Sequence, residues 1–230
     1  LQIMNENTFL KFLKNHNANI INSNLKRSKM ARDGRLNENE KIFEQEREKL
    51  LSAQNIKQLV DDPFVFLRRQ RVSEFLTRIH VFQQILNVGG SIVECGCRQG
   101  GSLMLYYHLS SILEPYNLTR KIYGFDSFGG FRSLSKNDDS NLDESIFSNV
   151  DYDLLKQFIE IQDYNRPLGH IPKVELIKGD ATETIPKFKE DHPELIIALL
   201  YIDFDIYEPT AVALEHLYSL VPKGGIVVFD

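Results

Sequence analysis

Six acidic residues follow short apolar runs, and their positions are the strongest chemical signal in this sequence. They are Glu94, Asp126, Asp180, Asp203, Asp205 and Asp230. The apolar runs alternate with helix-like segments, which predicts an α/β fold with a doubly wound, mainly parallel sheet. Ligands of such sheets bind beyond the carboxyl ends of the strands, where these acids are expected to lie. Taken singly, each acid can equally be a helix cap.

A glycine-rich turn follows the first of these acids. Residues 92–101 read Ile-Val-Glu-Cys-Gly-Cys-Arg-Gln-Gly-Gly, and a helix-like segment comes next. A strand that turns through glycines into a helix brings a ligand close to backbone amides at the helix N-terminus. Gly96, Gly100, Gly101 and Ser102 are therefore candidate binding residues. A dinucleotide site would place glycine where Glu94 stands, and this carboxylate would repel a pyrophosphate but tolerate a cationic or zwitterionic ligand.

Asp126 ends the next apolar run, about 25 residues after the turn, where an acid can accept hydrogen bonds from both ribose hydroxyls. This spacing indicates a nucleoside-containing cofactor. S-adenosylmethionine combines a ribose with an amine and a sulfonium and has no phosphate, so it fits a site that contains Glu94. An NAD(P)-dependent oxidoreductase and a non-catalytic, methyltransferase-like binding module are the two alternatives.

Four segments together resemble the first motifs of class I S-adenosylmethionine-dependent methyltransferases, and more closely the macrocin O-methyltransferase (TylF-like) family of sugar O-methyltransferases. They are residues 90–96, 124–131, 178–181 and 202–210. The resemblance extends over residues 70–230. It implies S-adenosylmethionine as the cofactor and a sugar hydroxyl as the acceptor, in a nucleotide sugar, a polysaccharide or a glycosylated natural product.

The resemblance also implies a role for each acid. Glu94 and Gly96 would lie at the methionine end of the cofactor, Asp126 with Ser127 at the ribose, and Asp180 with Ala181 at the adenine. Asp203 and Asp230, on neighbouring strands, would hold Mg²⁺, which needs few carboxylates. Asp203 or Asp205 would remove the proton from the acceptor hydroxyl. The family's further metal-binding acid falls directly after the position of Asp230, the last residue of the sequence.

The remaining sequence predicts the organisation of the chain. We expect a polar arm over 1–35, N-terminal helices over 36–90 and a methyltransferase domain over 91–230, with a lid over 127–173. The expected strands cover 92–95, 121–126, 174–180, 196–203 and 226–230, and the expected helices cover 37–60, 64–86, 101–114, 151–164 and 209–220. Because the last strand would leave an apolar edge, we expect the native chain to continue past Asp230.

Composition and charge narrow the class of partner. The formal net charge of -5 gives no sign of nucleic-acid binding. No apolar run approaches the length of a membrane span. Cys95 and Cys97 are predicted to be reduced, buried thiols, which suits a cytoplasmic protein. The apolar face of the helix over 37–60 suggests a homodimer.

Overall fold

The computed structural model describes residues 39, 41–43, 46, 50, 56–131, 134–138 and 150–230. The chain divides into two units, Leu1–Glu74 and Phe75–Asp230. The described part of the first unit contains helices α4 (Ile56–Asp61) and α5 (Pro63–Phe66) and the beginning of α6 (Arg69–Gln84). The predicted arm over 1–35 and much of the predicted helix over 37–60 lie outside the described residues. Ile42, Phe43 and Leu50, on the apolar face of that helix, are described and exposed, and the homodimer stays a prediction.

The second unit is built on a five-stranded, all-parallel sheet with the strand order β3-β2-β1-β4-β5. The strands are β1 (Ser91–Cys95), β2 (Ile122–Asp126), β3 (Val174–Lys178), β4 (Ile197–Ile202) and β5 (Ile226–Phe229). All five predicted strands are confirmed. The chain fills one half of the sheet from β1 to β3 and then returns to place β4 on the other side of β1. The gap between β1 and β4 is therefore the topological switch point, where ligands of such sheets bind.

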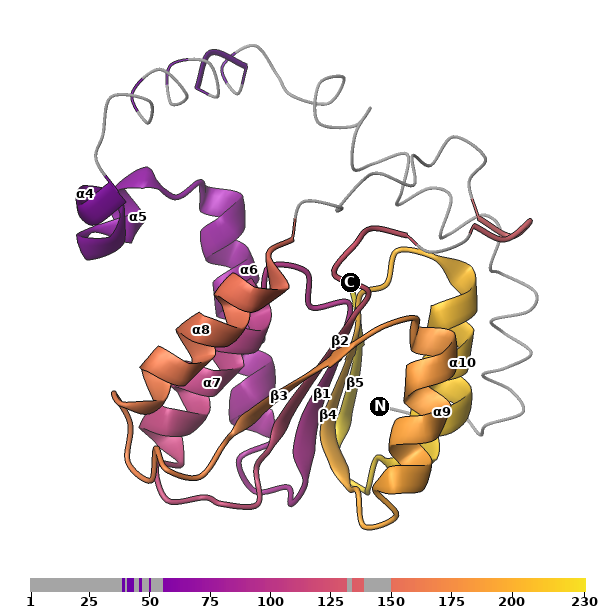
Figure 1. Ribbon diagram of the computed structural model, residues 1–230. Helices are drawn as coiled ribbons and strands as arrows, with labels where there is room; N and C mark the ends of the chain where they lie inside the picture. The colour runs from indigo at the N-terminus through magenta and orange to yellow at the C-terminus, as the bar shows by residue number, and fades with distance from the viewer. Residues whose placement is uncertain are drawn as a thin grey trace. The chain divides into compact units, whose positions relative to one another are not determined.

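Helices cover both faces of the sheet (Figure 1). On one face lie α7 (Gly101–Leu113) and α8 (Tyr152–Asp163), together with the part of α6 that belongs to this unit. On the other face lie α9 (Ala181–Asp191) and α10 (Tyr207–Leu217), which continues into the short 3-10 helix η1 (Tyr218–Leu220). The predicted helices over 101–114, 151–164 and 209–220 are confirmed, with boundaries shifted by a few residues, whereas α9 was not predicted from the sequence.

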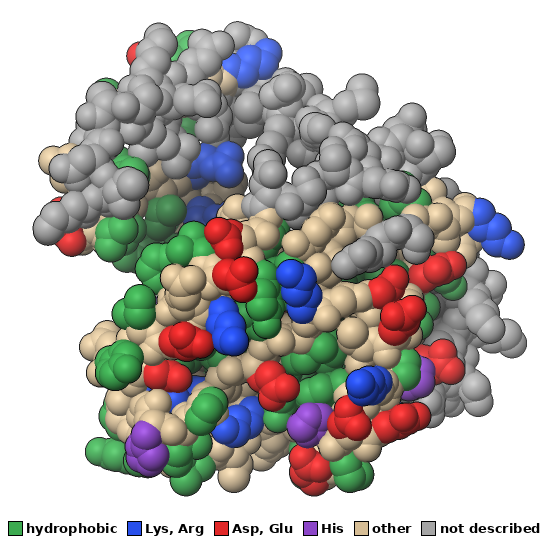
Figure 2. Space-filling model, in the orientation of Figure 1, with side chains coloured by type: hydrophobic (Ala, Val, Ile, Leu, Met, Phe, Trp, Pro, Cys, Tyr) green, Lys and Arg blue, Asp and Glu red, His purple; other side chains and the backbone are tan. Residues whose placement is uncertain are grey.

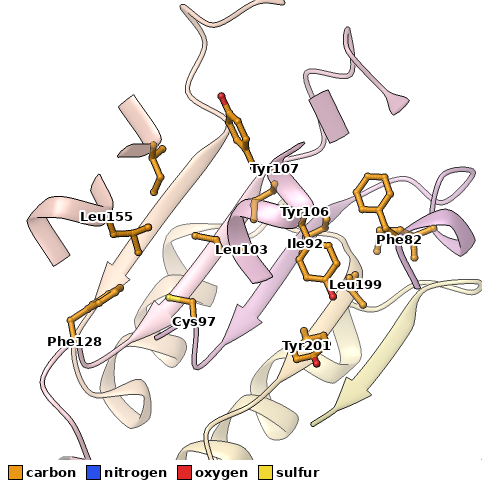
Figure 3. Close-up of a cluster of buried hydrophobic side chains, with 14 residues drawn as sticks. Phe82, Ile92, Cys97, Leu103, Tyr106, Tyr107, Phe128, Leu155, Leu199 and Tyr201 are labelled. Atoms are coloured by element: carbon orange, nitrogen blue, oxygen red, sulfur yellow. The ribbon is translucent and has the colours of Figure 1, made fainter. Parts of the chain in front are cut away.

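The two central strands are buried along their whole length, because both faces are covered by helices. On the face of α6 and α7, Tyr106 lies between Phe82 and Tyr201 in one hydrophobic cluster (Figure 3). On the opposite face, Phe188 of α9 packs edge-on against Phe125, with ring centroids 5.1 Å apart. The hydrophobic cluster that contains Tyr106 also includes Cys97. Like Cys95, Cys97 is a buried free thiol, as predicted.

A cluster of buried cations closes the amino edge of the sheet, where the strands begin. Arg120 is 1% exposed. It donates hydrogen bonds to the carbonyl oxygens of Ile85, Val88 and Gly90 and pairs with Glu114 at 2.8 Å. These bonds join the end of α6, the beginning of β1 and the loop before β2 through one side chain.

Lys173 stands beside Arg120 at the same edge and is also buried. Its Nζ donates to the hydroxyl of Ser110 at 3.0 Å and to the carbonyl oxygens of Asn117 and Arg120 at 3.1 and 3.2 Å. Three donors therefore meet three acceptors. Burial lowers the pKa of Lys173 to about 8, and the neighbouring cation Arg166 adds to this effect.

On the face shown in Figure 2, acidic and basic side chains are interspersed, with no continuous basic patch. Within the described ranges, no helix has both the length and the apolar character needed to cross a membrane.

Candidate active site

The register of the sheet brings the ends of three strands to one level. Glu94 pairs with Tyr201 and Cys95 with Ile202, while Ile202 pairs with Phe229 on the next strand. The ladder continues one step further, because the amide of Asp203 donates to the carbonyl of Cys95 at 2.7 Å. The residues that follow these strands, among them Asp203 and Asp230, are therefore neighbours at the carboxyl edge, as the sequence predicts.

The glycine turn after β1 packs directly against the end of β4. Gly96 has a φ of +92°, and a Cβ at this position would lie 2.1 Å from the carbonyl oxygen of Asp203. Glycine is required here for both reasons. Gly100, with a φ of +78°, caps α7, whose first two residues are Gly101 and Ser102. The predicted binding residues of this turn thus surround the N-terminus of one helix beside the switch point.

Glu94 is completely buried at the end of β1. Its Oε1 accepts a hydrogen bond from the hydroxyl of Ser102, and its buried Oε2 has no hydrogen-bond partner among the described residues. Burial raises the pKa of Glu94 to about 7, although Ser102 and Arg78 lower it. An unsatisfied oxygen on a buried carboxyl group is costly unless a ligand completes it.

Asp126 ends β2 with both carboxylate oxygens facing the glycine turn and the following loop. One oxygen accepts from the amide of Arg98 and the other from the amide of Phe128, both at 2.7 Å. These bonds hold the carboxylate in one orientation, although burial raises the pKa of Asp126. Ser127 beside it donates to the carbonyl of Gly130. Each carboxylate oxygen keeps further acceptor capacity, which suits a ribose diol.

Asp180 lies at the edge of the site, after β3. Its Oδ1 accepts from the amide of Thr182 at 2.9 Å and from the Thr182 hydroxyl at 2.7 Å, so it is the N-cap of α9. Ala181 is the first residue of that helix and is buried. The amide of Gly179 donates to the carbonyl of Asp126, which ties this turn to the end of β2. Asp180 is thus a helix cap. The hydrogen bond from Gly179 to Asp126 also places Asp180 one strand away from Asp126, the predicted ribose residue.

Asp203 and Asp230 form a coupled acid pair after β4 and β5. Burial, together with repulsion from Asp230, Asp205 and Glu94, raises the pKa of Asp203 to about 9. A hydrogen bond to Asp230 also favours the protonated form of Asp203. The carboxyl of Asp203 therefore holds its proton more tightly than an isolated aspartate does, unless a cation lies beside it.

Asp205 stands two residues further, in a left-handed conformation with a φ of +61°. Loss of contact with water and repulsion from Asp230 raise the pKa of its carboxyl to about 6, while Arg98 lowers it. The residue is exposed, so water screens part of this effect. The pKa of Asp205 is therefore raised less than that of Asp203.

Arg78 belongs to this site although no sequence motif contains it. It lies on α6, one turn before Phe82, and is 7% exposed. Its Nη2 lies 3.5 Å from Oδ2 of Asp230, and its guanidinium lies 5.3 Å from the ring centroid of Tyr201. The only sequence signal is its spacing: positions 75, 78 and 82 share one helix face, so this arginine falls among core residues.

Asp138 is a second residue that the sequence analysis missed. It is buried in the short described part of the predicted lid. Its Oδ1 accepts from the amide of Tyr207 at 2.7 Å, and its Oδ2 accepts from the amide of Ser135 at 2.7 Å. Asp138 therefore attaches this part of the segment to the N-terminus of α10, directly after Asp205.

Among the described residues at the carboxyl edge, Asp203 and Asp230 are the side chains that fit a hard cation such as Mg²⁺. Among the residues that the structure describes, no three or more His, Cys, Asp or Glu side chains form a metal-binding group. Two adjacent carboxyl groups still fit Mg²⁺, which keeps several waters and takes one or two protein carboxylates.

A doubly wound parallel sheet with a glycine turn after its first strand is the architecture of class I S-adenosylmethionine-dependent methyltransferases, although other enzyme classes share it. The model of the macrocin O-methyltransferase (TylF) family matches residues 4–230. The chain belongs to this family and is an S-adenosylmethionine-dependent O-methyltransferase. The oxidoreductase alternative does not account for this match.

Solved structures agree with the family assignment. The crystal structure of CalS11, calicheamicin methyltransferase, is 33% identical, with a TM-score of 0.78 over 85% of this chain and 79% of that chain. The apo structure of CalS11, TDP-rhamnose 3'-O-methyltransferase, gives 32% identity and a TM-score of 0.70 over the same shares. The O-methyltransferase NovP is 22% identical, with a TM-score of 0.55 over 68% and 64%, and shares the fold. No curated protein matches the chain.

Proposed function

We propose that this enzyme transfers a methyl group from S-adenosylmethionine to a hydroxyl of a sugar, with Mg²⁺ assisting. The acceptor is a nucleotide sugar, a polysaccharide or a glycosylated natural product. The observation that carries the proposal is the group of acids Asp203, Asp205 and Asp230 at the carboxyl edge, beside the cofactor-type residues Glu94 and Asp126. The described relative CalS11 is a TDP-rhamnose 3'-O-methyltransferase, which favours a nucleotide sugar.

The proposed cofactor site runs across the strand ends. Glu94 and the turn Gly96–Ser102 hold the methionine end, Asp126 with Ser127 the ribose, and Asp180 with Ala181 the adenine. The order of the strands supports this sequence of contacts, because β3, β2 and β1 are consecutive neighbours. A cofactor laid along them ends with its reactive centre near the switch point, next to β4.

The base must be a carboxylate that is ionised while the acceptor is bound. Asp205 fulfils this condition directly, because its pKa is about 6 and rising pH leaves it charged. Burial and the neighbouring acids raise the pKa of Asp203 further, to about 9, as long as no cation lies beside it. Asp205 is therefore the favoured proton acceptor of the two candidates, and Asp203 is favoured as a metal ligand with Asp230. When bound there, Mg²⁺ would neutralise the acid pair and lower the pKa of the acceptor hydroxyl.

The acceptor pocket is expected beside the N-terminus of α10. Asp138 holds residues 135–138 against Tyr207, so both segments stand next to the proposed base. Tyr207 and Glu208 are candidates for contacts with the sugar. Orientation of the acceptor oxygen in line with the donor methyl and sulfur supplies much of the rate, and a fixed segment at this position favours that orientation.

The direct test measures methyl transfer to TDP-rhamnose and a panel of other nucleotide sugars by mass spectrometry. The reactions contain S-adenosylmethionine and either Mg²⁺ or EDTA. We expect a methylated sugar that depends on Mg²⁺. Asp205→Asn should lower kcat by roughly a hundredfold or more, because it removes a general base. Asp203→Asn should also lower activity, but higher Mg²⁺ should restore part of it if Asp203 is a metal ligand.

Asp191→Asn is the matched control, because Asp191 is an exposed acid at the end of α9. Its activity should equal that of the unmodified enzyme. Unchanged turnover in Asp205→Asn would exclude this residue as the base. Full activity in EDTA would remove Mg²⁺ from the proposal. Methylation of non-sugar hydroxyls alone would overturn the acceptor class while leaving the family assignment intact.

A further inference from the structure

The segment that joins β4 to α10 is held by hydrogen bonds at both of its ends. At its beginning, the amide of Asp203 donates to the carbonyl of Cys95 at 2.7 Å. At its end, the amide of Tyr207 donates to Oδ1 of Asp138 at 2.7 Å. Asp205 lies halfway between these two bonds and is exposed. Residues from other parts of the chain therefore fix the backbone on either side of the proposed base.

The bond to Asp138 supplies a cap that α10 lacks in its own sequence. The N-cap position of α10 is Ile206, which makes no side-chain cap hydrogen bond. A carboxylate at a helix N-terminus satisfies a backbone amide that has no partner within the helix, and it interacts favourably with the helix dipole. Asp138 is 69 residues away in the sequence and only 9% exposed, so the tertiary structure brings a buried carboxylate to this helix end.

The other oxygen of Asp138 closes the turn in which Asp138 lies. Its Oδ2 accepts from the amide of Ser135 at 2.7 Å, and the amide of Asp138 donates to the carbonyl of Ser135 at 3.1 Å. The two oxygens thus bind two different segments, the turn over 135–138 and the beginning of α10. A carboxylate suits both bonds, whereas the amide of asparagine offers only one acceptor oxygen.

Asp205 has a backbone conformation that needs support from its surroundings. Its φ of +61° falls in the left-handed region, which residues other than glycine rarely adopt, although aspartate tolerates it better than most. Such conformations persist where the surrounding structure fixes them, and they are frequent at functional sites. The hydrogen bonds of the Asp203 and Tyr207 amides fix the chain on both sides of Asp205.

We propose that Asp138 is a positioning residue for Asp205. It holds the backbone two residues after the base and so directs the Asp205 carboxylate toward the acceptor hydroxyl. The inference rests on the role proposed above for Asp205, and Asp138 acts through the Tyr207 amide rather than on the substrate. The turn over 135–138 then contributes to turnover itself as well as to the acceptor pocket.

The first test measures kcat and KM for methyl transfer to TDP-rhamnose, with S-adenosylmethionine and Mg²⁺ at saturation. Asp138→Ala should lower kcat about 10- to 100-fold, because a misplacement of about 1 Å can cost about a hundredfold in rate. The KM for TDP-rhamnose and the Kd of S-adenosylhomocysteine should each change less than about threefold, since the base is displaced and the ligands are still bound. Asp138→Asn, which keeps one acceptor oxygen, should recover part of kcat.

Asp151→Ala is the matched control, because Asp151 is also an aspartate that caps a helix. It is the N-cap of α8, and its side chain accepts from the amide of Leu154 at 2.9 Å. Each alanine variant loses one cap, so the Tm of both should fall by about 2 to 4 °C. Only Asp138→Ala should lose turnover. If its kcat stayed unchanged, like that of Asp151→Ala, Asp138 would only stabilise the fold and the proposal would be overturned.

A double variant tests whether Asp138 acts through Asp205. Asp138→Ala combined with Asp205→Asn should be no more than about twofold slower than Asp205→Asn alone, because a base that is absent cannot be misplaced. If the two losses multiplied instead, Asp138 would affect the rate independently of Asp205, which contradicts the proposal.

A crystal structure of Asp138→Ala gives a readout that needs no turnover. Asp205 should leave the left-handed region, and an unchanged φ would overturn the proposal. If Asp138→Ala does not fold, as judged by circular dichroism, Asp138→Ser replaces it in every measurement. Full turnover in Asp205→Asn is a different result, because it removes the base from the proposed function. Absence of methyl transfer to TDP-rhamnose in the unmodified protein concerns the acceptor, and the crystal structure then decides about Asp138.

Discussion

The two edges of the sheet bury charge in opposite ways. At the amino edge, Arg120 and Lys173 donate to carbonyl oxygens and to Glu114 and Ser110, and the three donors of Lys173 each have an acceptor. At the carboxyl edge, Glu94 has a buried oxygen that meets no hydrogen-bond partner in the described part of the chain, and Asp203 lies among other acids. Both edges contain buried ionisable groups, but only one has its hydrogen bonds completed by the protein.

This difference separates a structural role from a binding role. A buried charge with all its hydrogen bonds made holds segments together, and its loss costs stability. A buried charged group that lacks some of its hydrogen bonds lowers stability. Such a group is retained where a ligand supplies the missing hydrogen bonds. Perturbed pKa values occur at both edges, in Lys173 and in Glu94, so a shifted pKa alone does not identify the site.

Arg120→Met should have the largest effect on stability. The substitution removes bonds to three segments and leaves Glu114 buried without its cation, so the free energy of unfolding should fall by about 3 to 5 kcal/mol. Urea denaturation measures this loss. Lys121→Met at the neighbouring, half-buried position should cost less than about 1 kcal/mol. Equal losses for the two variants would contradict the structural role of Arg120.

Glu94→Gln should change how stability depends on pH. The folded pKa of about 7 lies above the ordinary 4.5, so the folded protein retains a proton that the unfolded chain releases. The unmodified protein should therefore lose up to about 3 kcal/mol as pH rises from 4.5 to 7. Glu94→Gln should not show this loss, whereas the exposed control Glu183→Gln should. Identical slopes in all three proteins would refute the buried, protonated state.

Lys173→Met tests the amino edge with the opposite sign. The folded pKa of about 8 lies below the ordinary 10.5, so the unmodified protein should gain stability as pH rises through this range. The variant should lack the gain and should lose about 1 to 2 kcal/mol at neutral pH, because three hydrogen bonds disappear. Thermal unfolding at several pH values provides the measurement, with the exposed Lys187→Met as control. If Lys173→Met still became more stable as pH rises, the gain in stability would belong to another titrating group.

Asp180→Asn should have the smallest effect on stability and a selective effect on binding. Asparagine also caps helices, so the free energy of unfolding should change by less than about 0.5 kcal/mol. If Asp180 accepts from the adenine amino group, the amide nitrogen of asparagine would oppose that donor. Affinity for S-adenosylhomocysteine should then fall about tenfold, or about 1.4 kcal/mol. An unchanged affinity would leave Asp180 with its capping role alone.

Local patterns in the sequence were sufficient to predict the strands, the glycine turn and the acids at the strand ends. Alternating apolar runs and helix-like segments specify a parallel sheet, and such a sheet brings the residues after each strand to one edge. The proximity of Asp203 and Asp230 could be predicted for this reason. Their coupling could not be predicted, because it depends on burial and on the register between β4 and β5.

Only the tertiary structure brought Arg78, Asp138, Arg120 and Lys173 to their places. Each acts on partners far away in the sequence, such as Asp230 for Arg78 and Tyr207 for Asp138. No sequence motif surrounds these residues. From the sequence alone, a buried arginine on a helix face cannot be distinguished from any other charged residue. The sequence by itself determined where the ligand edge lies. Packing between distant segments decided which buried charged groups find their hydrogen-bond partners within the protein and which keep an atom for a ligand to bind.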